Sequence, residues 1–175
     1  MLMNELKTLV DLCLFQAKPQ DFPYSQGWML LAALVLWTGI FASNPDQNQN
    51  QTSLIVALIA IVHVAAYGFA VWIALRLRSK PERFVQTLTT LFGSAALLQF
   101  VNWPFVNWLV KTQDTPDAQL PLLFIFVLGI WTFAVAVNIN RHAMEVTTGQ
   151  SILITLGIQV FAASIVFILF GALMI

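Results

Sequence analysis

Charge is what this 175-residue sequence has least of. Charged residues make up 9% of the chain, against about 25% in soluble domains, while hydrophobic residues make up 59%. Eight Lys and Arg balance eight Asp and Glu, and this balance excludes the basic excess that nucleic-acid binding requires. So few charges could not cover the surface of a soluble domain of this length. We therefore expect an integral membrane protein whose first partner is the lipid bilayer.

Cysteine is nearly absent as well, because Cys13 is the only one in the chain. A single cysteine excludes an intramolecular disulfide and a cysteine-based metal site. The sequence also lacks an HExxH motif and a glycine-rich phosphate loop, and Gly93-Ser94 is not followed by the second glycine of a nucleophile elbow. We therefore expect a protein that is not an enzyme and that holds no metal and no cofactor.

Five stretches without charge separate the charged residues, at 22–45, 47–75, 84–110, 118–140 and 146–175. About 20 helical residues cross a hydrocarbon core of ~30 Å, and backbone groups in lipid must be paired within the segment. We therefore predict an all-α polytopic membrane helix bundle with five transmembrane helices. The predicted spans are 27–42, 54–75, 84–103, 120–137 and 152–173, and they form one transmembrane domain at 21–175.

Local signals mark the ends of some of these spans. Thr147 followed by Gln150 predicts a capping box just before the fifth span, and Ser79 followed by Pro81 and Glu82 predicts another before the third. Proline disfavours helical geometry in the residue before it, so we expect Pro104 to end or bend the third span.

The N-terminal segment, residues 1–20, is predicted to form an amphipathic helix. Its apolar residues recur at three- and four-residue steps, with polar residues opposite. Such a helix lies in the plane of the membrane interface. Leu12 and Phe15 interrupt its polar face, so packing against the bundle is one alternative and docking to a partner is another.

Lys and Arg fall unevenly between the segments that connect the spans. The N-terminal segment and the 76–83 and 138–150 loops together hold seven, whereas the 43–53 and 109–119 loops together hold one. The positive-inside rule then places the N-terminus in the cytoplasm and the C-terminus in the periplasm or outside the cell. Candidates for binding anionic headgroups are Arg76, Arg78, Lys80, Arg83, Arg141 and His142. The alternative is that these residues only fix the topology.

No charged residue lies within a predicted span, and this absence disfavours ion-coupled transport, which usually needs an intramembrane charge. Uncharged polar residues instead form rows along the predicted helices. Thr87, Thr90 and Ser94 share one face of the third span, and Ser151, Thr155 and Gln159 follow at four-residue spacing in the fifth. Thr132, Ala136 and Asn140 have the spacing of close helix packing in the fourth.

These rows have two interpretations: hydrogen bonds that hold helices together, or a polar groove between the third and fifth spans. Near mid-membrane, His63 is either a relay or ligand residue or a neutral histidine satisfied by a neighbouring helix, with Tyr67 one turn away. The candidate intramembrane polar cluster consists of His63, Tyr67, Thr90, Ser94, Gln99, Asn102 and Gln159.

A family resemblance rests on the number and orientation of the predicted spans and on two local motifs. Asp21-Phe22-Pro23-Tyr24 precedes the first span, and the stretch from Trp131 through Arg141-His142-Ala143-Met144-Glu145 leads to Thr148-Gly149-Gln150-Ser151. With five spans and a cytoplasmic N-terminus, these features resemble the bacterial type of the Yip family of small membrane proteins. The resemblance implies a bacterial inner membrane as the location. The vesicle-traffic role of eukaryotic members is not carried over, because their long cytoplasmic tail is missing.

We therefore expect a non-enzymatic inner-membrane protein, a scaffold or accessory subunit that acts with a protein partner or with a second copy of itself. The first alternative is a carrier or channel for a neutral or weakly polar solute, with the groove between the third and fifth spans as its path. The second alternative is an intramembrane enzyme built on His63.

Overall fold

The structure is a computed structural model that describes residues 2–42, 53–113 and 115–171, and within these ranges its regular secondary structure is entirely helical. The six α-helices are α1 (Leu2–Cys13), α2 (Gln26–Ala42), α3 (Ser53–Leu77), α4 (Phe84–Thr112), α5 (Gln119–Met144) and α6 (Thr148–Phe170). Three single 3₁₀ turns, η1 (Pro19–Asp21), η3 (Pro81–Arg83) and η4 (Pro116–Ala118), precede α2, α4 and α5. The predicted all-α class is confirmed.

Four of the helices, α3 to α6, are long and apolar enough to cross a membrane. This finding confirms the polytopic helical architecture. α2 coincides with the predicted span 27–42 and is apolar, but its 17 residues fall at the lower end of the lengths that cross a bilayer. A crossing by α2, and with it the total of five, stays a prediction.

The helices that contain the predicted spans 84–103 and 120–137 extend beyond them. α4 continues through Pro104 to Thr112, and α5 continues to Met144. A proline removes one N–H donor, and membrane helices tolerate that loss when neighbouring helices support them. Here Phe105, just after the proline, stacks on Phe124 of α5 with ring centroids 4.8 Å apart. α6 begins at Thr148, four residues before the predicted 152; the predicted end at 173 lies outside the described residues.

The predicted capping box at Thr147 is confirmed. Its Oγ1 accepts a hydrogen bond from the Gln150 amide at 3.4 Å, and its own amide donates to Gln150 Oε1 at 3.3 Å. The predicted box at Ser79 is wrong, because Ser79 adopts a left-handed conformation with φ 56°. It ends α3 there, where the Lys80 amide donates to the Leu75 carbonyl at 2.9 Å.

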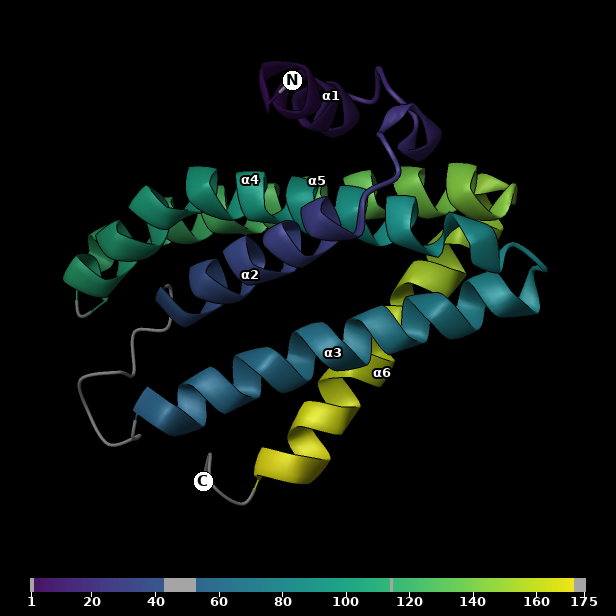
Figure 1. Cartoon of the computed structure of the whole chain (residues 1–175). Helices are drawn as coiled ribbons and strands as arrows, with labels where there is room; N and C mark the ends of the chain where they lie inside the picture. The colour runs from purple at the N-terminus through teal and green to yellow at the C-terminus, as the bar shows by residue number, and fades with distance from the viewer. Residues whose placement is uncertain (1, 43–52, 114, 172–175) are drawn as a thin grey trace.

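Helix packing arranges the bundle around α4. α4 and α5 run side by side, α2 packs against α4, and α3 crosses α6 on the other side of the molecule (Figure 1). α5 and α6 meet near the α5–α6 turn. A cluster of buried apolar side chains includes Leu75, Leu88, Ile139 and Met144 from this end of the bundle. We call this end of the bundle the basic end, because Lys80, Arg83 and Arg141 lie there.

α1 lies across the outer side of α4 and α5 (Figure 1), which agrees with the alternative in which the N-terminal segment packs against the bundle. Leu12, one of the two residues that interrupt its polar face, is fully buried. The other, Phe15, packs its ring against Trp131 with centroids 5.6 Å apart. The Trp131 indole also donates to the Cys13 carbonyl at 3.0 Å, so α5 holds the end of α1 in place.

α1 packs tightly against α4 at Gly93. A Cβ added there would lie 2.8 Å from Cδ2 of Leu9, closer than non-bonded carbons approach. We expect Gly93→Ala to lower the melting temperature of the purified protein in detergent, through an overpacking cost of about 1–3 kcal/mol. Adding Leu9→Ala should recover part of this loss, because it removes the clashing atoms.

Gly129→Ala in α5 is the matched control. Nothing lies within 4 Å of a Cβ at that position, and alanine is the better helix former, so this variant should be neutral or slightly more stable. Equal melting temperatures for the two glycine variants, or purely additive losses in the Gly93→Ala and Leu9→Ala double variant, would contradict the docking of α1 at Gly93.

Candidate functional site

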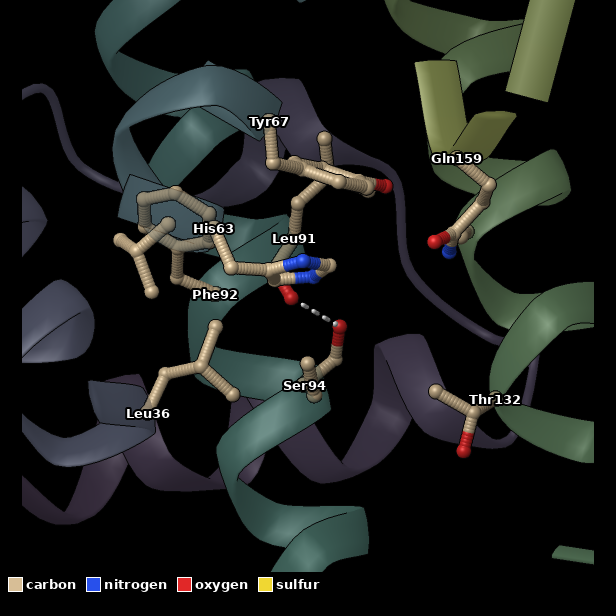
Figure 2. A pocket seen from close by; sticks show the side chains of 11 residues that line it. Leu36, His63, Tyr67, Leu91, Phe92, Ser94, Thr132 and Gln159 are labelled. Atoms are coloured by element: carbon tan, nitrogen blue, oxygen red, sulfur yellow. Dashed lines mark hydrogen bonds between the residues drawn. The ribbon is translucent and has the colours of Figure 1, made fainter. Parts of the chain in front are cut away.

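A cavity of about 120 Å³ lies at the middle of the bundle and brings together four residues of the predicted cluster. His63 and Tyr67 come from α3, Ser94 from α4 and Gln159 from α6, and Figure 2 shows them around one space. His63 and Gln159 each lie about halfway along their helix. We call this space the central cavity. It draws on more helices than the predicted groove between the third and fifth spans.

Helical spacing explains why these side chains share the cavity. His63 and Tyr67 are four residues apart, so they lie on one face of α3. Thr132 and Ala136 show the same spacing on α5. The rest of the lining is apolar and comes from Leu36, Val64, Leu91, Phe92 and Ala95. No charged side chain belongs to this lining, so the cavity presents neutral hydrogen-bonding groups in apolar walls.

Two of the polar groups are satisfied by their own helices. Ser94 Oγ donates to the Thr90 carbonyl at 2.7 Å and lies 3.2 Å from the Leu91 carbonyl, while Thr132 Oγ1 donates to the Leu128 carbonyl at 2.8 Å. Such back-bonding is the usual arrangement of Ser and Thr in apolar helices.

The other three polar side chains of the lining are not satisfied in this way. No hydrogen bond joins the imidazole of His63, the hydroxyl of Tyr67 or the amide of Gln159 to another residue that the structure describes. These three groups are therefore the ones that water or a ligand would complete.

The remaining members of the predicted cluster lie elsewhere. Thr90 is fully buried one turn from Ser94, and its hydroxyl donates to the Gln86 and Thr87 carbonyls at 2.9 and 3.0 Å. Gln99 lines a second cavity of about 180 Å³ together with Thr38 of α2. Asn102 belongs to the lining of neither cavity. The structure thus brings four of the seven residues to one cavity and places Gln99 elsewhere, because the face of α4 that carries Gln99 turns towards α2.

Hydrogen bonds also link the polar rows of α5 and α6. The Asn140 amide donates to Thr155 Oγ1 at 3.0 Å, and Ser151 Oγ donates to the Val137 carbonyl at 2.6 Å. Asn140, Ser151 and Thr155 are all fully buried. Ser151 and Thr155 of the α6 row therefore join helices, as the first of the two interpretations predicts, whereas Gln159 lines the cavity. The spacing of Thr132 and Asn140 indicated close packing only, so sequence reasoning missed their polar role.

Charged residues at the basic end bind one another and the end of α5. The carboxylate of Glu145 forms ion pairs with Lys80 Nζ, at 2.5 Å, and with Arg83 Nη2, at 2.6 Å. Arg83 Nη1 also donates to the carbonyls of Ala143, at 3.1 Å, and His142, at 3.4 Å. A guanidinium at the C-terminal carbonyls of a helix is favoured by the helix dipole. Lys80 and Arg83 therefore hold the α3–α4 connection against the end of α5.

The other predicted headgroup-binding residues are placed differently. The guanidinium of Arg76 lies 5.0 Å from the centre of the Trp72 ring. Arg78 and Arg141 are exposed. His142 is half-buried, and its carbonyl also accepts a hydrogen bond from Gln20 at 2.9 Å. In the described part of the chain, no three His, Cys, Asp or Glu side chains come together as metal ligands would.

The ion pairs of Glu145 predict a pH dependence. Its hydrogen bonds, with Lys80 first and then Arg83, hold the pKa of this carboxyl below its usual 4.5. Their stabilisation is present above the unfolded-state pKa and is lost as the pH falls through the lowered folded-state pKa. We expect the difference in melting temperature between the native protein and Glu145→Gln to be constant near neutral pH and to shrink below about pH 4.5.

Glu82→Gln is the control, because Glu82 is an exposed carboxylate of the same connection. It should leave the melting temperature nearly unchanged at neutral pH. A difference between the native protein and Glu145→Gln that stays constant from neutral to strongly acidic pH would contradict the assignment of these ion pairs.

Comparisons with known proteins do not indicate a function for this chain. No family model, no curated protein and no solved structure matches the chain. The central cavity, the linked polar rows and the ion pairs at the basic end are therefore the observations from which a function is argued.

Proposed function

We propose that this chain is a non-enzymatic carrier of a bacterial inner membrane, and that its central cavity binds a small neutral solute through hydrogen bonds. One observation carries the proposal: His63, Tyr67 and Gln159 face the cavity without a hydrogen bond to another described residue. Polar groups left without a partner in an apolar medium are costly. A solute that completes their hydrogen bonds therefore gains affinity.

The cavity limits the chemistry of the solute. At ~30 Å³ for each water, 120 Å³ holds about four water molecules or a molecule with about four to six non-hydrogen atoms. The phenol of Tyr67 donates and accepts, the amide of Gln159 does both, and a neutral imidazole does both. The lining offers no charge to pair with an ion. Small amides and polyols meet these requirements.

Location and orientation are part of the same proposal. The excess of Lys and Arg in the segments at the basic end supports a cytoplasmic basic end and a cytoplasmic N-terminus. A crossing by all five apolar helices would then put the C-terminus in the periplasm. The resemblance to bacterial Yip-type proteins supports the inner membrane as the location and adds no activity.

A second candidate is the scaffold or accessory subunit, and the outer face of α6 favours it. Gly157 and Ser164 are exposed there, and nothing lies within 4 Å of a Cβ at Gly157. Small residues let another membrane helix approach closely, so this face fits a helix of a partner or of a second copy.

Solute flux tests the first candidate. We expect proteoliposomes to take up acetamide, urea or glycerol faster than empty liposomes in stopped-flow light scattering. Gln159→Leu should slow the uptake about tenfold, the effect of one lost hydrogen bond of ~1.4 kcal/mol, and His63→Phe should do the same. Gln119→Leu should have no effect, because Gln119 is exposed at the start of α5 and outside the lining.

Uptake no faster than in empty liposomes for all three solutes would contradict the carrier. Equal rates for the native protein and Gln159→Leu would contradict the assignment of the cavity as the binding site. If flux is absent and the protein purifies in mild detergent with a stoichiometric protein partner, the scaffold is the better account.

A further inference from the structure

An apolar groove lies between α2 and α3, with side chains of α4 at its base. α2 packs mainly against α4, and α3 packs mainly against α6 (Figure 1), so these two consecutive helices leave a space between them. The space has a volume of about 330 Å³, and no charged residue and no side-chain hydroxyl or amide belongs to its lining. We call it the α2–α3 groove.

The groove lies in the half of the bundle at the basic end. On α3 its lining runs from Val64 to Trp72, a length of about 12 Å at 1.5 Å per residue. Half of a hydrocarbon core of ~30 Å is ~15 Å thick, so the groove follows most of one leaflet. Phe84, the first residue of α4, also lines it, and this places the end of the groove beside the α3–α4 connection.

Small residues keep the groove open. Ala33 of α2 and Ala65 of α3 both line it. At Gly68, an added Cβ would already lie 3.5 Å from Cδ2 of Leu88, which is van der Waals contact with α4. Lipid tails are as apolar as leucine side chains. An acyl chain of the surrounding bilayer therefore matches this lining in polarity.

Arg76 stands at the end of the groove. It follows Trp72 by four residues, so the two lie on one face of α3, and its guanidinium lies 5.0 Å from the centre of the Trp72 ring. The side chain of Arg76 is exposed, and it makes no ion pair and no hydrogen bond with the residues that the structure describes. Lys80 and Arg83, in contrast, are paired with Glu145. The groove thus ends at a cation without an anionic partner.

Phosphate is the anion that this arrangement fits. Stacking on an aromatic ring uses the face of a guanidinium and leaves the N–H groups at its edge to donate. Arginine binds phosphate through two such N–H groups in parallel. Basic pockets between membrane helices on the cytoplasmic side are typical sites for anionic headgroups. An apolar groove that ends at Arg76 therefore complements both parts of a phospholipid.

We propose that the α2–α3 groove binds an anionic phospholipid, with one acyl chain along Ala65 and Gly68 and the headgroup phosphate at Arg76. A headgroup with net negative charge is preferred, because it neutralises Arg76 and brings no second cation to it. This inference goes beyond the proposed function and does not depend on it. Val64 and Phe92 belong to the linings of both the groove and the central cavity, so the bound chain packs against one wall of that cavity.

Lipid retention by the purified protein tests the headgroup. The protein in mild detergent is mixed with phosphatidylglycerol or phosphatidylcholine of identical acyl chains, and native mass spectrometry counts the lipids that each chain retains. We expect one phosphatidylglycerol to be retained at a concentration about tenfold below that needed for phosphatidylcholine. Arg76→Gln should abolish this preference, because it removes a charge-assisted hydrogen bond to the phosphate.

Arg141→Gln is the matched control for the loss of charge. Arg141 is exposed at the same end of the bundle, but it belongs to α5, which contributes no residue to the groove. This variant should therefore keep the preference for phosphatidylglycerol. Equal retention of the two lipids by the native protein, or an equal loss of preference in Arg76→Gln and Arg141→Gln, would overturn the proposal.

Filling the groove tests the acyl chain. Ala65 is exposed and lines the groove, so we expect Ala65→Phe to weaken retention of both lipids about tenfold. Ala163→Phe is the matched control, because Ala163 is equally exposed on α6 and outside the lining. If Ala65→Phe does not give a single gel-filtration peak, Ala33→Phe in the α2 wall replaces it with the same expectation.

Two outcomes of this second test would count against the groove as a lipid site. Unchanged retention in the groove-filling variant would overturn the assignment of the acyl chain. A stoichiometric protein that co-purifies with the native chain and is lost in Ala65→Phe but not in Ala163→Phe would show that a protein, and not a lipid, occupies the groove. Ala65 lies outside the lining of the central cavity, so solute flux is measured separately from lipid retention.

Discussion

The need to satisfy polar groups away from water is the constraint on which this structure depends. Lipid offers no hydrogen-bond partners, so every polar side chain on a long apolar helix must bond to its own backbone, reach another helix or face a hydrated space. Ser94 and Thr90 take the first course and Asn140 takes the second, through Thr155. His63, Tyr67 and Gln159 are left for the third, and they meet at one cavity. The candidate site is thus a place where three polar side chains without a hydrogen-bond partner among the described residues meet.

At the basic end, charged side chains stabilise the helix ends. α3 and α5 both end there on a residue with left-handed geometry, Ser79 and Glu145, conformations that cost free energy for residues other than glycine. At Glu145 the side chain forms ion pairs with Lys80 and Arg83. Arg83 also binds the last carbonyls of α5. The same contacts hold the start of α4 against the end of α5, the two helices that carry Ser94 and Thr132 of the cavity.

Sequence reasoning predicted the helices of this fold well because charge is so scarce. Stretches without charge gave the apolar helices, and the rows through Ser94 and Gln159 gave the faces that meet at the cavity. The length of α4 could not be predicted, because support after Pro104 comes from the stacking of Phe105 on Phe124 of another helix. Gln99 and Asn102 were misplaced for a similar reason: spacing along one helix does not tell which neighbour each face meets.

The residues missed in the sequence are those whose polarity matters only through a tertiary partner. Asn140 has the spacing of a close-packing position, and its role follows from the position of Thr155. The pairing of Lys80 and Arg83 with Glu145 joins residues more than sixty positions apart, which no local pattern indicates. The position of α1 also depends on tertiary contacts. Leu12 interrupts the amphipathic pattern of α1, and it is buried because α1 packs against α4 and α5.

Water-edited solid-state NMR of the labelled protein in lipid bilayers tests the central claim most directly. The claim is that the bundle keeps water inside, at the polar residues, and lipid outside. Polarisation transferred from water should reach the imidazole of His63 and the amide of Gln159, while Leu153 and Val160 on the exposed face of α6 should receive it from lipid methylenes. Water contact at Leu153 and Val160, or lipid contact alone at His63 and Gln159, would contradict the account.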